Sequence, residues 1–113
     1  MPNVIEMRTY RAKPGMRQPL MDILVKRSFP AFRRIGMTVL GPFPSVEDPD
    51  MFFWMRGFPD LPSREAMRNA FYDGALWNTE LEKLIMPLIE TYEAVVVEDP
   101  AHQLRDAFQA ASA

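Results

Sequence analysis

The chain has 113 residues, a net charge of −2 and no cysteine. This length predicts a single domain, and without a basic run the charge gives no indication of a nucleic-acid or membrane partner. Its longest apolar runs are too short to span a bilayer. The missing cysteines exclude disulfides and thiolate chemistry and are consistent with a reducing compartment. Because residues 1–10 lack the pattern of a signal peptide, we do not expect secretion by that route.

The first third of the chain predicts a strand followed by a long helix. Residues 4–11 alternate in the period of a strand, which ends before a Pro-Gly turn. Apolar side chains then recur at helical spacing over residues 17–35. Pro30 lies inside this helix, so we expect a kink near residues 26–30, and Gly36 is suited to end it.

The rest of the chain predicts two strands, a broken helix and a last strand. TVLGPF is expected to be an edge strand, because Pro42 has no N–H to donate to a ladder. FFWMRGF, at 52–58, has the strongest strand pattern in the chain. A second helix is expected to begin at Asp60 or Ser63, with an interruption at Asp73 and Gly74, and YEAVVVE at 92–98 is the last strand.

The order strand, helix, strand, strand, helix, strand predicts an α+β fold. Two right-handed halves of this kind form the ferredoxin-like βαββαβ sandwich, with a four-stranded antiparallel sheet in the order 4-1-3-2 and both helices on one face. We assign residues 1–100 to this single domain. Residues 101–113 form a C-terminal tail, which is either frayed or a short helix that uses Leu104 and Phe108.

Alternation divides the two central strands into an apolar face and a polar-aromatic face. We expect the apolar face to pack on the helices; its residues are Ile5, Met7, Phe53 and Met55. The uncovered face then holds Glu6, Arg8, Tyr10, Phe52, Trp54, Arg56 and Phe58. Exposed aromatic surface costs ~25 cal/mol per Å². A second copy of the sheet is therefore expected to cover this face, giving a dimeric α/β barrel with a cavity between the two sheets.

The charges on the polar-aromatic face allow two interpretations. Glu6 and Arg56 could form only a cross-strand ion pair, worth under about 1 kcal/mol if exposed. Alternatively, the pair is desolvated and orients a ligand, with an arginine holding a carboxylate or enolate in bidentate geometry. We favour the ligand pocket, because aromatic and charged residues share one face, and we favour binding over catalysis.

Three segments resemble the NIPSNAP family in order and spacing: IEMRTYRAKPGM, SFPAFRRIGMTVLGPF and MFFWMRGFPDLPSREAMRNAFYDGALW. The match covers about residues 4–98. The resemblance implies the dimeric α/β-barrel fold and a homodimer, and it implies no settled activity. Since the sequence has one such domain and no Arg/Ser-rich leader, we expect a bacterial, cytoplasmic member. The family's recurring positions fall on the residues that we take as candidate ligand-binding residues: Glu6, Arg8, Tyr10, Trp54, Arg56 and Trp77.

Other chemistry has little support in the sequence. His102, the single histidine, lies in the tail and is expected on the surface. No metal site and no cofactor are expected, because the acidic VEDPD segment is typical of a solvated turn and a glycine-rich phosphate loop is missing. We favour Trp77 as a core anchor over a position at a cavity mouth with Gly74 as the hinge of a lid.

Three functional hypotheses follow. The leading one is a homodimer that binds a small acidic or aromatic metabolite in the barrel cavity. The second is a cofactor-independent isomerase or monooxygenase, with Glu6 as a base whose pKa is raised by burial and with Arg8 or Arg56 stabilising an enolate. The third is a scaffold with a solid interior whose outer helices bind a partner protein.

Overall fold

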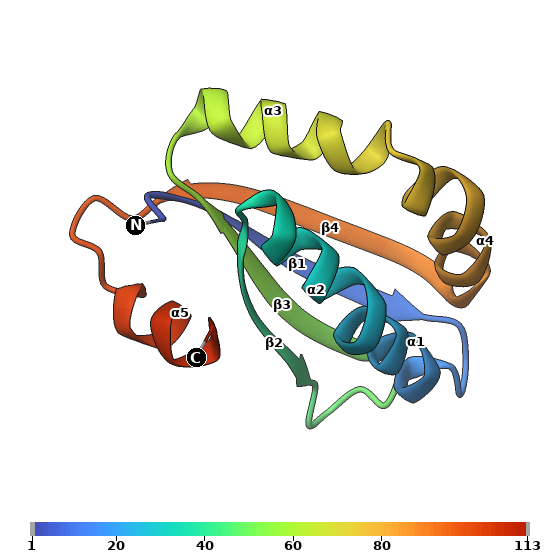
Figure 1. The fold of residues 1–113 in the computed structure, drawn as a ribbon. Helices are drawn as coiled ribbons and strands as arrows, with labels where there is room; N and C mark the ends of the chain where they lie inside the picture. The colour runs from blue at the N-terminus through green and yellow to red at the C-terminus, as the bar shows by residue number, and fades with distance from the viewer. Residues whose placement is uncertain (1, 113) are drawn as a thin grey trace.

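A computed structural model describes residues 2–112 (Figure 1). Its centre is a four-stranded sheet in the order β2-β3-β1-β4, with every neighbouring pair antiparallel. The strands are β1 (Val4–Ala12), β2 (Thr38–Pro44), β3 (Met51–Phe58) and β4 (Ile89–Glu98). The predicted α+β class and ferredoxin-like strand order are confirmed.

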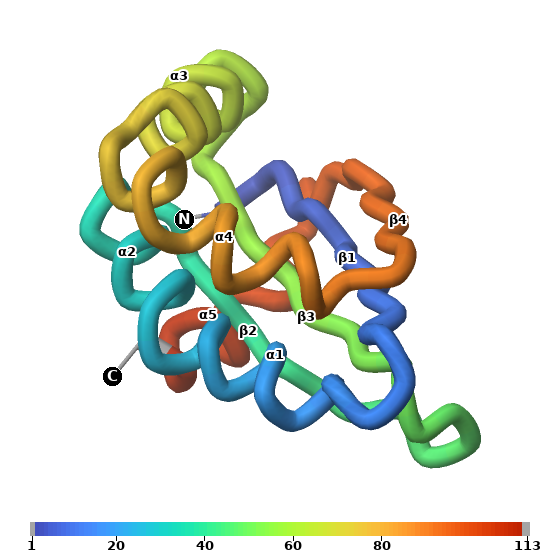
Figure 2. Tube along the Cα trace, turned by 90° about the vertical axis from the view of Figure 1, so that its right-hand side faces the viewer, coloured from blue at the N-terminus to red at the C-terminus, as the bar shows by residue number. Residues whose placement is uncertain are grey.

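Two helical segments cover one face of this sheet. The first consists of α1 (Arg17–Ile23), a π-helical segment (Leu24–Ser28) and α2 (Phe29–Ile35). The second consists of α3 (Leu61–Tyr72), a π-helical segment (Trp77–Leu81), α4 (Glu82–Ile85) and a 3₁₀ turn (Met86–Leu88). Figure 2 shows α2, α3 and α4 together on one side of β1 and β4. A last helix, α5 (Arg105–Ser112), stands apart from these helices in Figure 1.

The expected kink in the first helix is a π-helical segment. The N–H of Phe29 donates to the carbonyl of Leu24, five residues earlier, and Pro30 follows in the first turn of α2. Because Pro30 has no N–H, the helix cannot form the usual bond to residue 26. The wider π turn accommodates this loss.

The structure reverses the predicted faces of the central strands. The side chains of the polar-aromatic set are all buried under the helices, at most 7% exposed: Glu6, Arg8, Tyr10, Phe52, Trp54, Arg56 and Phe58. The apolar set lies on the outer face of the sheet: Ile5, Met7, Phe53 and Met55. The prediction was wrong because the helices carry basic and aromatic side chains, which satisfy the buried charges of the strands.

The pairing of the two central strands agrees with the alternation. Glu6 lies opposite Arg56, Arg8 opposite Trp54, and Tyr10 opposite Phe52. The polar and aromatic residues therefore share one face, but the chain's own helices cover it. A second subunit is therefore not needed to bury these aromatic side chains, and the prediction that one must cover them is wrong.

The tail docks on the outer face of the sheet through α5. Phe108 is 1% exposed and packs with Ile5 and Met55. The carboxylate of Asp99 accepts hydrogen bonds from the backbone N–H groups of residues 103 and 104, at 2.9 and 3.0 Å, and these bonds lower the pKa of Asp99.

Within residues 2–112, every helix is too short or too polar to cross a membrane. A cytoplasmic location stays a prediction of the sequence.

Replacing Phe108 by alanine is expected to lower the free energy of unfolding by about 3 kcal/mol, because the side chain is fully buried and its removal leaves a cavity. Urea unfolding followed by circular dichroism measures this change. Gln109→Ala, on the exposed side of α5, serves as the control and should change the free energy by less than about 0.5 kcal/mol. A loss below about 0.5 kcal/mol for Phe108→Ala would show that α5 is not docked.

Candidate functional site

One buried carboxylate lies among four guanidinium groups. Glu6 Oε1 accepts hydrogen bonds from Arg56 Nε at 2.8 Å and from Arg8 Nη1 at 2.9 Å. Glu6 Oε2 accepts one from Arg64 Nε at 2.7 Å, and Arg68 Nε lies 3.6 Å away. The side chains of Glu6 and Arg56 are 0% exposed. This cluster, named here the Glu6 cluster, carries three more positive than negative charges.

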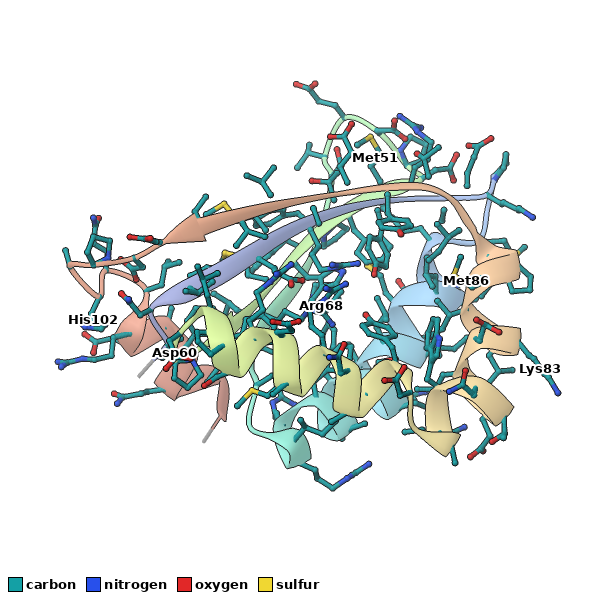
Figure 3. All side chains as sticks on the ribbon, turned by 90° about the horizontal axis from the view of Figure 1, so that it is seen from above. Met51, Asp60, Arg68, Lys83, Met86 and His102 are labelled. Carbon is teal, nitrogen blue, oxygen red and sulfur yellow. The ribbon has the colours of Figure 1, made fainter. Side chains whose placement is uncertain are left out.

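Local structure explains how the Glu6 cluster is assembled. The β1–β3 register sets Glu6 opposite Arg56. Arg64 and Arg68 are one turn apart on α3, so both extend from the same side of this helix. Asp60 is the N-cap of α3, and its side chain accepts a hydrogen bond from the N–H of residue 63 at 2.7 Å. Figure 3 shows Arg68 between α3 and the sheet.

Aromatic rings surround the two arginines that extend from the sheet. The guanidinium carbon of Arg56 lies 5.0 Å from the ring centre of Phe32, 5.6 Å from that of Tyr72 and 5.7 Å from that of Trp54. The corresponding carbon of Arg8 lies 5.4 Å from Trp54. Cation–π attraction at these distances compensates in part for the water that the cations lose on burial.

Burial by itself raises the pKa of Glu6. The positive charge and hydrogen bond of Arg56, together with Arg8 and Arg64, lower it by more, so the pKa of Glu6 lies below its usual value. Glu6 is therefore a carboxylate at neutral pH, and both its oxygens already accept hydrogen bonds. The hypothesis of a catalytic base required a raised pKa, and in this respect it is wrong.

A cavity of about 360 Å³ lies beside the Glu6 cluster, between the sheet and the helices of one chain. This volume is within the range of small-molecule sites. Its polar lining consists of Arg8, Tyr10, Ser28, Arg64, Arg68, Tyr72 and Glu82, and its aromatic lining of Phe32, Phe71, Trp77 and Tyr92. The sequence predicted that the polar-aromatic residues face a cavity between two sheets; they lie instead under the helices of their own chain, beside this cavity.

The cavity has a polar end and an apolar end. Arg8 lies opposite Ala94 in the sheet, whereas the pair at the other end is Ala12 and Ile89. Arg64 and Arg68 lie at the same end as Arg8, because all three contact Glu6. Near Ile89, the lining includes the aliphatic side chains of Leu24, Ile85 and Met86. It also includes the acidic side chain of Glu82, less than one turn before Ile85 in α4.

Hydroxyl groups at the polar end are oriented by the arginines. The hydroxyl oxygen of Tyr10 accepts a hydrogen bond from Arg8 Nη2 at 3.3 Å, and that of Tyr72 accepts one from Arg56 Nη1 at 3.1 Å. The hydrogen of each hydroxyl is then left to donate. Burial raises the pKa of Tyr10 although Arg8 opposes it, so the phenol keeps its proton at neutral pH. The polar end therefore offers donors and positive charge, the combination that binds an oxyanion.

Three of the six predicted site residues line the cavity: Arg8, Tyr10 and Trp77. The other three, Glu6, Trp54 and Arg56, lie behind its wall and contact the lining residues. Trp77 also packs against Phe71 and Tyr72, with ring centres 6.0 and 5.2 Å apart, as a core anchor would.

The lining residues that were not predicted from the sequence include Ser28 and three residues of α3. Arg64, Arg68 and Tyr72 follow one another at intervals of four residues, which places them on one stripe of a helix. That spacing, on a helix with a clear N-cap, was a usable signal. Ser28 gave no such signal. Among residues 2–112, no group of three acidic or histidine side chains is arranged to hold a metal ion.

A four-stranded antiparallel sheet with helices covering one face defines the class of ferredoxin-like α+β proteins. This class includes a candidate antibiotic biosynthesis monooxygenase from Nitrosomonas europaea, with a TM-score of 0.68 and 12% identity, over 88% of this chain and 93% of that one.

Within this class, the fold is that of NIPSNAP proteins. A NIPSNAP-domain protein from Burkholderia xenovorans gives a TM-score of 0.75 at 20% identity, over 87% of this chain and 95% of that one. A NIPSNAP family protein of unknown function from Agrobacterium tumefaciens gives a TM-score of 0.74 at 24% identity, over 87% of this chain and 88% of that one. No protein-family model and no curated protein matches the sequence. The predicted resemblance to the NIPSNAP family is confirmed by the structural similarity.

Replacing Glu6 by glutamine is expected to lower the free energy of unfolding by about 3–5 kcal/mol at pH 7, because four guanidinium groups then lose their shared anion. Since the pKa of Glu6 is lowered from 4.5 in the fold, the stability that its charge contributes is present above pH 4.5 and is lost as the pH falls through the folded value. Urea unfolding between pH 7 and pH 3 should show the difference between variant and wild type shrinking below pH 4.5.

Glu65→Gln is the matched control, because Glu65 is an exposed acid on α3. It should change stability by less than about 0.5 kcal/mol at every pH. If Glu6→Gln also did so, the Glu6 cluster would not contribute to stability.

Proposed function

We propose that the cavity binds a small acidic metabolite with an aromatic or other apolar part. The observation that carries this proposal is the charge imbalance at the polar end, where four guanidinium groups share the single carboxylate of Glu6. Arg68 Nε has no hydrogen-bond partner, and neither has the buried Nε of Arg8. An oxyanion in the cavity would pair with the guanidinium groups of Arg8, Arg64 and Arg68, which line it, and would reduce the repulsion among the cations.

The apolar remainder of the cavity supports the second half of the proposal. Phe32, Phe71 and Trp77 contribute rings to its wall, and Leu24 and Ile85 contribute aliphatic surface. If the ligand were only an inorganic anion, this apolar surface would remain in contact with water. An acid with an apolar body would occupy both ends and gain the burial of its body.

Binding is favoured over the two alternative functions. For a cofactor-independent enzyme, the candidate base Glu6 lies behind the cavity wall and accepts hydrogen bonds at both oxygens. For a scaffold, the sequence hypothesis required a solid interior, whereas a cavity of about 360 Å³ lies beside Arg8.

We also propose a homodimer through the outer face of the sheet. On this face Val95 is 57% exposed and Phe43, from β2, is 47% exposed, next to the partly buried Met7 and Phe53. Such an apolar face on one side of a sheet is typical of a contact between subunits. This proposal does not depend on the buried aromatic residues that first suggested a dimer.

Arg68→Gln is expected to weaken the binding of small aromatic acids about tenfold, because it removes a charge-assisted contact to the anion. Isothermal titration calorimetry with a panel of aromatic and aliphatic carboxylates, with benzoate as the reference probe, measures this change. Arg34→Gln, an exposed arginine of α2 away from the cavity, is the control and should leave the affinity unchanged. If no acid of the panel binds the wild type, or if both variants bind equally well, the proposed function is wrong.

Val95→Lys is expected to convert a dimer into a monomer, because it introduces a charge into the proposed interface. Size-exclusion chromatography with light scattering should give twice the 13.1 kDa of one chain for the wild type and a single chain for the variant. Val25→Lys, at an exposed valine in the π-helical segment after α1, should remain dimeric. A monomeric wild type at micromolar concentrations would refute the dimer.

A further inference from the structure

Ser28 is a buried hydroxyl group on the cavity wall that no other contact explains. Its side chain is 1% exposed, it lines the cavity, and its Oγ has no hydrogen-bond partner in the protein. A serine inside a helix often bonds to a carbonyl one turn earlier, but this one does not. An unpaired buried hydroxyl costs about 1–3 kcal/mol, so such groups need an explanation.

Helical spacing locates Ser28 along the cavity. Leu24, Ser28 and Phe32 are each four residues apart and all line it. Phe32 lies at the polar end, because its ring stacks on Trp54 with centres 5.8 Å apart and lies under the guanidinium of Arg56. Leu24 belongs to the aliphatic end. Ser28 is therefore about one turn, or roughly 6 Å along the helix, from the polar end.

The size of the cavity limits what can reach both positions. Its volume of about 360 Å³ has room for roughly a dozen non-hydrogen atoms, on the basis of the ~30 Å³ that each molecule occupies in liquid water. A one-ring acid with a substituent is of this size. The rings of Phe71 and Trp77 on the wall are suited to pack against the body of such a molecule.

We infer that the ligand is an aromatic acid whose ring carries a hydroxyl or keto oxygen that hydrogen-bonds to Ser28. Its anionic headgroup, a carboxylate or a phosphate ester, lies at Arg8, Arg64 and Arg68, and the ring extends toward Leu24. This inference rests on the proposed function and narrows its ligand class. Ser28 then acts as a specificity residue, because a ligand without the oxygen leaves its hydroxyl unpaired.

Calorimetric titration of the full chain with matched probes tests this inference. The probes are benzoate, 3-hydroxybenzoate, 4-hydroxybenzoate, phenyl phosphate, phenol and inorganic phosphate. We expect one of the hydroxybenzoates to bind about fivefold more tightly than benzoate, the gain of one neutral hydrogen bond. Phenol and inorganic phosphate should bind at least about tenfold more weakly, because each lacks one half of the ligand. Benzoate compared with phenyl phosphate identifies the headgroup.

Ser28→Ala separates the role of the hydroxyl from that of the cavity. In this variant the preference for the hydroxylated acid should disappear, while benzoate binds within about twofold of wild type, since only one hydrogen bond is removed. The variant should fold, because it loses only an unpaired hydroxyl, and its urea midpoint and circular dichroism check this. Ser63→Ala, on α3 away from the cavity, should keep the preference.

The outcomes distinguish this inference from the proposed function. If neither hydroxybenzoate binds more tightly than benzoate, or if Ser28→Ala keeps the preference, the inference is overturned. The proposed function stands in that case, provided that benzoate binds and Arg68→Gln weakens it. If none of the acids binds the wild type, both are overturned.

Discussion

The burial of one carboxylate among four guanidinium groups is the interaction on which the rest of the structure depends. Glu6 connects β1 to β3 through Arg56 and connects the sheet to α3 through Arg64. Each partner alone would be costly to desolvate, and together they are stable only because the hydrogen bonds are direct. Since a single anion serves four cations, the same interaction that stabilises the fold leaves positive charge beside the cavity.

The cavity follows from how the helical layer is held above the sheet. At one end of this layer, Arg64 extends from α3 to reach Glu6, and Arg68 lies in the same gap between α3 and the sheet (Figure 3). At the other end, the π-helical segments Leu24–Ser28 and Trp77–Leu81 contribute Leu24, Ser28 and Trp77 to the wall. Widened helical turns are frequently found at functional sites, and here both of them border the same space. Charge and irregular helix geometry thus meet at one site.

The structural relatives define the fold, whereas the chemistry of the site has to come from this chain. The NIPSNAP structures match over most of their length at TM-scores of 0.74 and 0.75, but their sequences are only 20–24% identical to this one. A shared fold does not determine activity, which depends on particular side chains. The donors of Arg8, Arg68, Tyr10 and Ser28 are therefore the features from which a ligand class can be inferred.

The sequence by itself determined the order of the elements, the strand alternation and hence the grouping of Glu6 and Arg8 with Trp54 and Arg56. It did not determine which face the helices cover, because alternation with period two describes both faces equally well. Only the tertiary structure decided this, since the cost of burying Glu6 depends on Arg64, which is 58 residues away in the chain. The location of the cavity was decided in the same way, because its lining residues come from strands and helices that are far apart in the sequence.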